Sequence, residues 1–239
     1  MENIIETTET VISVMTDGKV FFVEKDLEIR KNLLKSVNSN QESGHKGLGY
    51  VIPPFNMLSL AGIYEFNSVH KACINLKAEL CSGLGVSFKK GVPEKIQKFF
   101  DNPNNNFNEN FSSLCVKLMI DYQAIGRFAL EIVRGVDEFS LYHIPAHEIY
   151  AVQDGSSIRV KNYLQQTSGG YFKPFKKYNP NKKVRGSSVL TMEEYSPTSR
   201  FYGIPEWMPA KKAIIGNDTI SDYMLNFFEN NARPDYFII

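Results

Sequence analysis

Two histidines and a glutamate come closest in type and spacing to a catalytic or metal-binding pattern. His143 and His147 are four residues apart, and Glu148 follows directly. Imidazole and carboxylate groups bind zinc, but side chains four apart share one face only in a helix. Pro145 stands between the histidines in a strand-like stretch, and the order differs from the His-Glu-x-x-His of zinc proteases. The pattern therefore predicts no metal site.

Other enzyme motifs are missing from the sequence. Gly83-Leu84-Gly85 lacks the third glycine and the acidic residue of a dinucleotide-binding fingerprint. There is no Gly-x-Ser-x-Gly nucleophile elbow, and no glycine-rich loop is followed by a phosphate-binding lysine. We therefore expect no enzymatic activity, no catalytic residue and no cofactor. Paired carboxylates leave no sequence signature, so an enzyme with a pocket of clustered acidic residues remains an alternative.

A basic segment with aromatic neighbours is a candidate for binding nucleic acid. It comprises residues 173–177 and 182–185, accompanied by Tyr171, Phe172, Phe175 and Tyr178. Such side chains can contact phosphates and stack on bases. The segment is short, however, and the chain is almost neutral, with 27 Lys and Arg against 26 Asp and Glu. We therefore expect it to be a solvent-exposed loop between two strands.

Composition bounds the class of protein. The chain has 239 residues, 43% of them hydrophobic, enough for one large domain or two small ones with a substantial core. Its cysteines are Cys73, Cys81 and Cys115, an odd number, and two lie on apolar helix faces, so we expect buried free thiols in a reducing cytosol. The acidic N-terminus does not resemble a signal peptide, and no apolar run approaches the roughly 20 residues that span a bilayer. These features predict a soluble protein made in a cytoplasm.

Hydrophobic periodicity predicts two amphipathic helices in the first half of the chain. The first has apolar residues at three- and four-residue steps from Phe66 and stops at Ser82-Gly83. Its apolar stripe is Val69, Cys73, Leu76 and Leu80. The second can be capped by Ser112 or Ser113 and ends at Gly126. Its apolar face is Leu114, Cys115, Leu118, Met119, Tyr122 and Ile125.

The segments around these helices are predicted to alternate between strand, helix and loop. Residues 84–88 indicate a strand, and Pro93 opens a short helix that reaches Phe100. The asparagine-rich residues 101–110 indicate a surface loop. Directly after Gly126 the apolar period changes from 3.6 to 2 over residues 127–133, which indicates a switch from helix to strand.

Short strands are predicted across the second half of the chain. They are residues 139–144, 148–153, 157–163 and 188–192. Asp154-Gly155 is typical of a tight β-hairpin turn, and Asp17-Gly18 indicates a second hairpin in a polar N-terminal arm. Residues 38–47 are too rich in turn formers to predict regular structure.

The last segment predicts a long helix that begins at Pro209 and reaches Asn230-Asn231. Gly216-Asn217-Asp218 is a point at which it could kink or restart. Its apolar face is Ile220, Tyr223, Met224, Phe227 and Phe228, and Asn217, Asp222, Asn226 and Glu229 lie on other faces. Pro234 stops the helix, and residues 235–239 predict a strand with an unpaired apolar edge, which indicates truncation.

Taken in order, these segments resemble the PBSX-type family of tailed-phage portal proteins. The most specific similarity is Tyr202-Gly203-Ile204-Pro205 followed by Trp207. Residues 50–54 with the helix of residues 68–77, and the helix, glycine and strand of residues 118–131, are similar to earlier parts of the family pattern. Residues 214–232 resemble a family helix that ends in Asn-Gly, where this chain has Asn231-Ala232. The resemblance covers about residues 48–239.

The resemblance implies an α+β fold with a defined domain order. Residues 1–49 would be a flexible N-terminal arm with one possible hairpin, and residues 50–208 the portal wing, with short antiparallel strands and packed helices. Residues 209–233 would be the stem helix, and 234–239 the start of a truncated clip. The family's returning stem helix, channel loop and crown come later than the last residue of this chain.

The resemblance also implies a structural function, namely a head-tail connector subunit in a dodecameric ring at the capsid vertex. Its partners would be the terminase large subunit, capsid and scaffold proteins, head-completion and tail adaptor proteins, and double-stranded DNA passing through the channel. It would be part of the virion and assemble in the host cytoplasm. The apolar face of the stem helix would pack against neighbouring subunits, and its polar residues Asn217, Asp222, Asn226 and Glu229 could line the channel.

An alternative from another class is a portal-derived fragment of a prophage. Such a protein would keep the wing fold and bind an intact portal or interfere with its assembly. Both hypotheses use the same motifs and differ only in whether a complete gene extends beyond Ile239.

Overall fold

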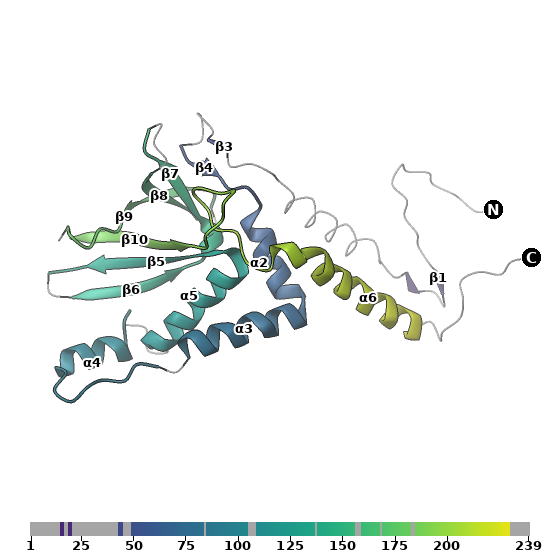
Figure 1. Cartoon of the computed structure of the whole chain (residues 1–239), viewed down its shortest axis with the longest axis horizontal. Helices are drawn as coiled ribbons and strands as arrows, with labels where there is room; N and C mark the ends of the chain where they lie inside the picture. The colour runs from purple at the N-terminus through teal and green to yellow at the C-terminus, as the bar shows by residue number, and fades with distance from the viewer. Residues whose placement is uncertain are drawn as a thin grey trace, which may run out of the picture.

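The chain folds as an α+β protein, which confirms the predicted class. The computed structural model describes residues 15–16, 19–20, 43–44, 49–83, 85–104, 109–136, 138–155, 159–167, 169–182 and 185–229. Within these ranges, helices α2 to α6 accompany a six-stranded mixed sheet. Figure 1 shows α3, α4 and α5 beside the sheet and α6 leading away from the body. None of the helices in these ranges is both long and apolar enough to cross a membrane.

The sheet is built from strands predicted in the second half of the chain and one strand that was missed. The strands are β5 (Arg127–Arg134), β6 (Phe139–Ile144), β7 (Ile149–Gln153), β8 (Val160–Gln166), β9 (Phe172–Lys177) and β10 (Gly186–Glu193). Their spatial order is β6-β5-β10-β9-β8-β7. All neighbours are antiparallel except β9 and β10, which pair in parallel, so the expectation of antiparallel strands holds for all but one pair.

Strand β9 corrects the prediction that the whole basic segment is a loop. Phe175 is the one buried residue of this strand and lies between the exposed Pro174 and Lys176. With a single buried position among lysines and a proline, the strand has no alternating pattern in the sequence. The described residues 178–182 and 185, between β9 and β10, belong to no helix or strand.

Two hairpins lie where the Asp-Gly pairs stand. Strands β7 and β8 pair around Asp154-Gly155, with Gln153 opposite Val160, so the connection is longer than the two-residue turn. Strands β1 (Met15–Thr16) and β2 (Lys19–Val20) pair around residues 17–18, and the rest of this predicted hairpin lies outside the described residues. Strand β3 (Ser43–Gly44) pairs with β4 (Val51–Ile52), so residues 43–44 do hold regular structure, contrary to prediction.

Asparagine caps begin three of the helices. Asn56 caps α2 (Met57–Phe66), Asn67 caps α3 (Ser68–Ser82) and Asn110 caps α5 (Phe111–Ile125), each accepting a hydrogen bond from a backbone N–H three residues on. The predicted serine cap of α5 is therefore wrong. The helix starts earlier, at Phe111, whose ring packs on Phe100 of α4 (Glu94–Asp101) with ring centroids 4.8 Å apart.

Two other local predictions also need correction. Residues 85–88 form no strand. Inside the predicted surface loop of residues 101–110, Asn104 and Glu109 are buried, and the Asn104 side-chain amide donates to the Glu109 carboxylate. Lys117 pairs with the same carboxylate. This buried network shows why the asparagine-rich composition was misleading, because amides satisfy buried polar groups as well as they bind water.

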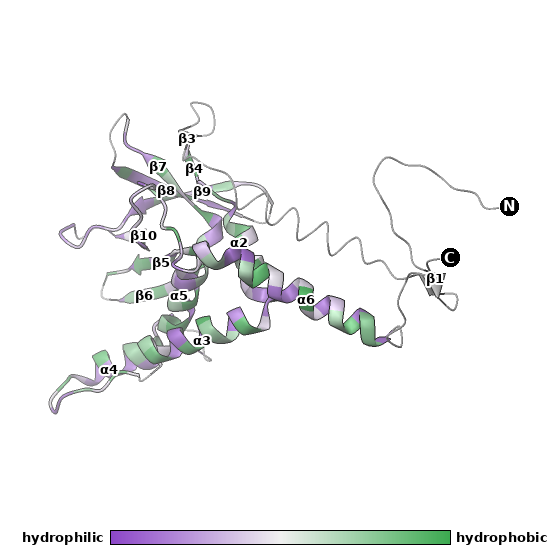
Figure 2. Cartoon of the chain, turned by 45° about the vertical axis from the view of Figure 1, so that its right-hand side comes forward, coloured by the Kyte–Doolittle hydropathy of each residue, from purple (hydrophilic) through white to green (hydrophobic). Residues whose placement is uncertain are grey.

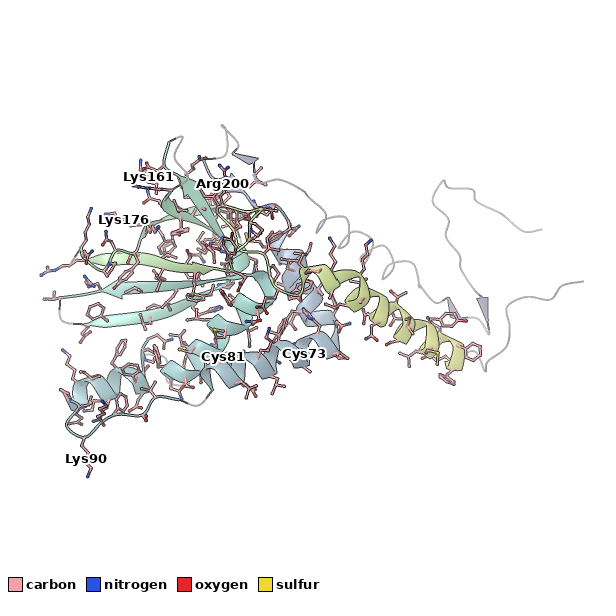
Figure 3. The ribbon with its side chains drawn as sticks, viewed as in Figure 1. Cys73, Cys81, Lys90, Lys161, Lys176 and Arg200 are labelled. Atoms are coloured by element: carbon pink, nitrogen blue, oxygen red, sulfur yellow. The ribbon has the colours of Figure 1, made fainter. Side chains whose placement is uncertain are left out.

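Helix α3 exposes the apolar stripe that its sequence predicted it would bury. Val69, Leu76 and Leu80 are exposed, as is Cys73. The face that packs inward is instead His70, Ile74 and Ala78. The prediction of buried thiols is therefore wrong for Cys73 and Cys81, and Cys115 is half-buried, where burial raises its pKa. Figure 3 labels Cys73 and Cys81 along the outer side of this helix.

Helix α6 (Lys211–Glu229) forms as predicted and runs without interruption through Gly216. A short 3-10 turn, Met208–Ala210, leads into it. Ile214 and Ile215 near its start pack against the main core, but no residue of the helix is fully buried. The predicted helix end and the strand of residues 235–239 lie outside the described residues.

Candidate functional site

The histidine and the glutamate considered as catalytic or metal-binding residues, His143 and Glu148, contact different partners. His143 pairs with Asp121 of α5, with 2.8 Å between Nε2 and Oδ2, and the Ala146 backbone N–H donates to the same oxygen. Glu148 accepts a hydrogen bond from Gln165 instead. Across the described ranges no group of three metal-ligating side chains comes together. Asp121 therefore fixes the turn before β7 to helix α5.

The Tyr-Gly-Ile-Pro motif lies on the turn that joins α5 to β5. Gly126 has φ +86°, a left-handed conformation that glycine adopts without strain. A Cβ on Gly203 would lie 1.9 Å from the Gly126 carbonyl oxygen and 2.5 Å from the Glu194 nitrogen. The Glu194 N–H donates to that same carbonyl at 2.8 Å. The two backbones therefore cross at a distance that only glycine permits.

Tyr122 adds a side-chain contact at this crossing. Its hydroxyl hydrogen-bonds to the Glu194 carboxylate, and this bond, together with burial, raises the pKa of Tyr122 to about 12. The tyrosine thus stays protonated and keeps donating at physiological pH. The crossing is held by both backbone and side-chain hydrogen bonds.

A fully buried arginine supports the motif from the sheet side. Arg127 is 0% exposed and pairs with Glu193 at 3.3 Å, while its Nη1 donates to the Ile149 carbonyl. Its guanidinium lies 5.0 Å from the centre of the Tyr202 ring. The other oxygen of Glu193 accepts from the Gly203 N–H. One ion pair thus connects the first residue of β5, the last residue of β10 and the motif.

Tyr202 extends this network to the start of the fold. Its hydroxyl donates to the Val51 carbonyl and accepts from the Ala151 N–H. Burial raises its pKa well above the ordinary value. Pro205 is also fully buried and Ile204 packs on the core. All four motif residues therefore serve to hold residues 201–205 in place.

The next residues attach the terminal helix to this junction. The Trp207 indole N–H donates to the carbonyls of Gln123 and Ala124 at the end of α5, and its ring meets His70 edge to face at 4.6 Å. Asn67 accepts from the His70 N–H and donates through Nδ2 to the Ile214 carbonyl at 3.0 Å. Asn67 thus caps α3 and binds α6 with one side chain.

The outer part of α6 carries an apolar stripe that the described chain does not cover. Ile220 is 64% exposed and Tyr223 66%. The other exposed apolar residues are Met224, Leu225, Phe227 and Phe228. Figure 2 shows hydrophobic segments along the part of α6 farthest from the body. A 19-residue helix has little stability alone in water, so this stripe marks a surface that needs a partner.

The polar residues of α6 that were predicted to line a channel lie on two different faces of the helix. Asp222, Asn226 and Glu229 follow at four and three residues and share one face. Asn217 lies three residues before Ile220 and seven before Met224, so the uninterrupted helix places it beside the apolar stripe. Only the first three therefore form a continuous polar face.

Sequence reasoning missed the residues that hold the junction. Arg127 was seen as a polar position of an alternating strand, and Asn67 was not singled out. The available signals were the asparagine directly before a helical period and the arginine directly after a helix-ending glycine. Neither signal reveals a partner more than 60 residues away along the chain.

Comparison with known proteins finds the fold in three solved assemblies. No protein-family model matches the chain, and no curated protein matches its sequence. A chain from the neck of an empty gene transfer agent particle, computed with C6 symmetry, matches 75% of this chain and 48% of its own length, at TM-score 0.61 and 18% identity. A chain from the virion of the native gene transfer agent particle matches 85% of this chain and 52% of its own length, at TM-score 0.60 and 19% identity.

A third match is from the neck of the native gene transfer agent particle, computed with C12 symmetry. It covers 87% of this chain and 52% of that chain, at TM-score 0.59 and 19% identity. The chain thus spans about half the length of the structures it matches. At these identities the likeness shows the fold alone. Over 75–87% of its length, this chain has a fold similar to that of chains found in the necks and virion of these particles.

Proposed function

We propose that this chain is a structural subunit of a portal, the ring at the capsid vertex of a phage-like particle. The observation that carries the proposal is the exposed apolar stripe of α6, on a helix anchored to an α+β body of this fold. The matched proteins come from particle necks computed with C6 and C12 symmetry, which supports a ring. The Tyr202–Pro205 junction then sets the direction in which the helix leaves the body.

Two separate apolar surfaces support head-to-tail assembly. Besides α6, helix α3 exposes a stripe at heptad-like spacing, made of Val69, Cys73, Leu76 and Leu80. A ring needs two different surfaces on each subunit, which meet between neighbours. In this proposal the stripes of α3 and α6 are buried between neighbouring subunits, and the polar face of Asp222, Asn226 and Glu229 lines the channel.

The proposed domain order follows the family. Residues 50–208 are the wing and residues 209–233 the stem helix, with 1–49 as the arm and 234–239 as the start of the clip. The partners are the terminase large subunit, capsid and scaffold proteins, head-completion and tail adaptor proteins, and double-stranded DNA in the channel. The ring itself does no chemistry in this proposal and belongs to the virion.

The test is the mass of the purified chain by light scattering over a range of concentrations, with negative-stain imaging of any assembly. Twelve copies of the 27.2 kDa chain weigh roughly 330 kDa, and we expect a discrete species near that mass with rotational symmetry. Ile220→Asp should abolish it, because a carboxylate cannot be buried unpaired in an apolar contact.

Asn226→Asp is the matched control. It adds the same charge six residues further along the same helix, on the polar face, and should leave the ring intact. A chain that stays monomeric at every concentration would contradict the proposal. A monomer that joins rings of a full-length portal protein would instead support the prophage-fragment alternative.

A further inference from the structure

A hollow lies at one end of the sheet, where four interior strands begin or finish. Strands β5 and β9 end there, at Arg134 and Lys177, and β8 and β10 begin there, at Val160 and Gly186. The described residues Tyr178, Asn179, Lys182 and Arg185, which lie between β9 and β10, line the hollow as well. The hollow has a volume of about 1060 Å³ and is open to solvent.

The walls of the hollow are strongly basic although the chain as a whole is almost neutral. Its cationic lining residues are Arg134, Arg159, Lys161, Lys176, Lys177, Lys182 and Arg185, and its acidic lining residue is Asp154. The hollow thus has seven basic side chains for one acidic side chain, whereas the whole chain has 27 Lys and Arg for 26 Asp and Glu. Concentrating like charge in a concave surface raises the local attraction for anions.

Two lysines that line this hollow make no ion pair with the described residues. Lys161 and Lys176 are exposed, and no carboxylate lies within 4.0 Å of either ammonium group in the described ranges. Figure 3 labels both on the β8–β9 side of the sheet, across the body from α6. Their charges are therefore available to a ligand.

The strand register adds a neutral donor to the same row. Asn162 lies opposite Lys176, and Lys176 lies opposite Ser188 of β10, whose hydroxyl already donates to the Ile132 carbonyl of β5. Amide groups such as that of Asn162 commonly donate to phosphate oxygens. The Arg134 guanidinium donates to the Lys182 carbonyl at 3.2 Å, which holds the connecting loop against β5. The basic surface is therefore built on a braced scaffold.

We propose that this hollow binds the phosphate backbone of duplex DNA, independently of sequence. The proposal goes beyond the ring function, since the hollow lies on the sheet and not on α6. An acidic protein segment fits less well, because every strand that lines the hollow is interior to the sheet. No free edge is available there to bind a peptide backbone by adding a strand. Dispersed cations and an amide donor on an open concave surface suit phosphates instead.

The experiment measures binding of a fluorescently labelled 30-base-pair duplex to the full chain by anisotropy at several salt concentrations. If about four phosphates are contacted, log K should fall with log salt at a slope near −4. Lys161→Gln with Lys176→Gln should weaken binding about tenfold or more and make the slope shallower by about two. A second duplex of unrelated sequence should bind equally well.

Lys89→Gln with Lys90→Gln is the matched control. Both lysines are exposed in the segment before α4, far from the hollow, and their removal changes the net charge equally (Figure 3). We expect an affinity within twofold of the unsubstituted chain. Equal losses in both double variants would overturn the proposal, because net charge alone would then explain binding.

Two further outcomes would overturn the assignment. If Lys161→Gln with Lys176→Gln leaves the affinity and the salt slope unchanged while circular dichroism shows a folded protein, the hollow is not the site. If a polyglutamate peptide binds more tightly than the duplex and loses binding in that variant, the occupant is an acidic protein segment. Light scattering on the same samples separates these results from ring assembly.

Discussion

Replacing Gly203 with alanine tests the idea that the Tyr-Gly-Ile-Pro motif exists to let two backbones cross. The new Cβ would lie 1.9 Å from the Gly126 carbonyl oxygen and 2.5 Å from the Glu194 nitrogen, so the chains must separate by more than 1 Å. Separating the chains strains the packing, which costs about 1–3 kcal/mol. It also breaks the hydrogen bond from the Glu194 N–H to the Gly126 carbonyl, which costs about another 1–3 kcal/mol. We expect the free energy of unfolding to fall by about 3–5 kcal/mol.

The assay is urea unfolding followed by two signals. Far-ultraviolet circular dichroism reports the whole fold, and fluorescence reports Trp207, which is the one tryptophan of the chain and contacts the end of α5. In a thermal melt of the same samples, the midpoint should fall by roughly 6–20 °C for a chain of this size. A fluorescence transition that comes earlier than the dichroism transition would show that the junction opens first.

The control is Gly216→Ala in α6, where a new Cβ would meet nothing within 4 Å. Alanine favours the helix over glycine by about 1 kcal/mol, so this substitution should stabilise the protein slightly. If the free energy of unfolding of Gly203→Ala is within about 1 kcal/mol of that of the unsubstituted chain, the crossing is not rigid and the steric account of the motif is wrong.

Two other predictions concern the attachment of α6. In chemical unfolding, Asn67→Ala should destabilise the protein by about 2 kcal/mol, because it removes both a helix cap and the hydrogen bond to the Ile214 carbonyl. Asn110→Ala removes a cap alone and should cost about 1 kcal/mol. Equal effects of the two substitutions would contradict the contact with α6. Burial lowers the pKa of His70, so as the pH falls the unfolded chain binds a proton before the folded chain does. The stability that His70 contributes is therefore complete above about pH 6.5 and is lost below it. His70→Phe should therefore show a smaller loss of thermal midpoint between pH 7.5 and 5.0, and an unchanged loss would show that other groups control it.

The elements that depend on local signals were largely predictable. The periods of α3 and α5, Pro93 before α4, Gly126 after α5 and Pro209 before α6 all stand within a few residues of the elements they specify. Helix caps and turns are decided by contacts three or four residues apart. The serine cap of α5 was the exception, because Asn110 caps the Ser113 N–H and the helix begins earlier, at Phe111.

The face that an element buries was not predictable in the same way. Helix α3 turns His70, Ile74 and Ala78 inward, although its more apolar stripe faces out. Hydrophobic periodicity shows that a helix has an apolar face but does not say whether the chain itself or a neighbouring subunit covers it. The lysine-rich β9 was missed because burial of Phe175 depends on strands β8 and β10 on either side.

The sequence by itself determined the α+β class, most helix positions, the near-zero net charge and the motif at residues 202–205. The tertiary structure decided what these residues contact. Arg127 meets Glu193 and Tyr202 only after β5 and β10 pair, and the cations of the hollow converge only when four strand ends align. Local preferences are encoded in neighbouring residues, whereas burial and charge clustering arise from pairings between distant segments, which no short stretch of sequence specifies.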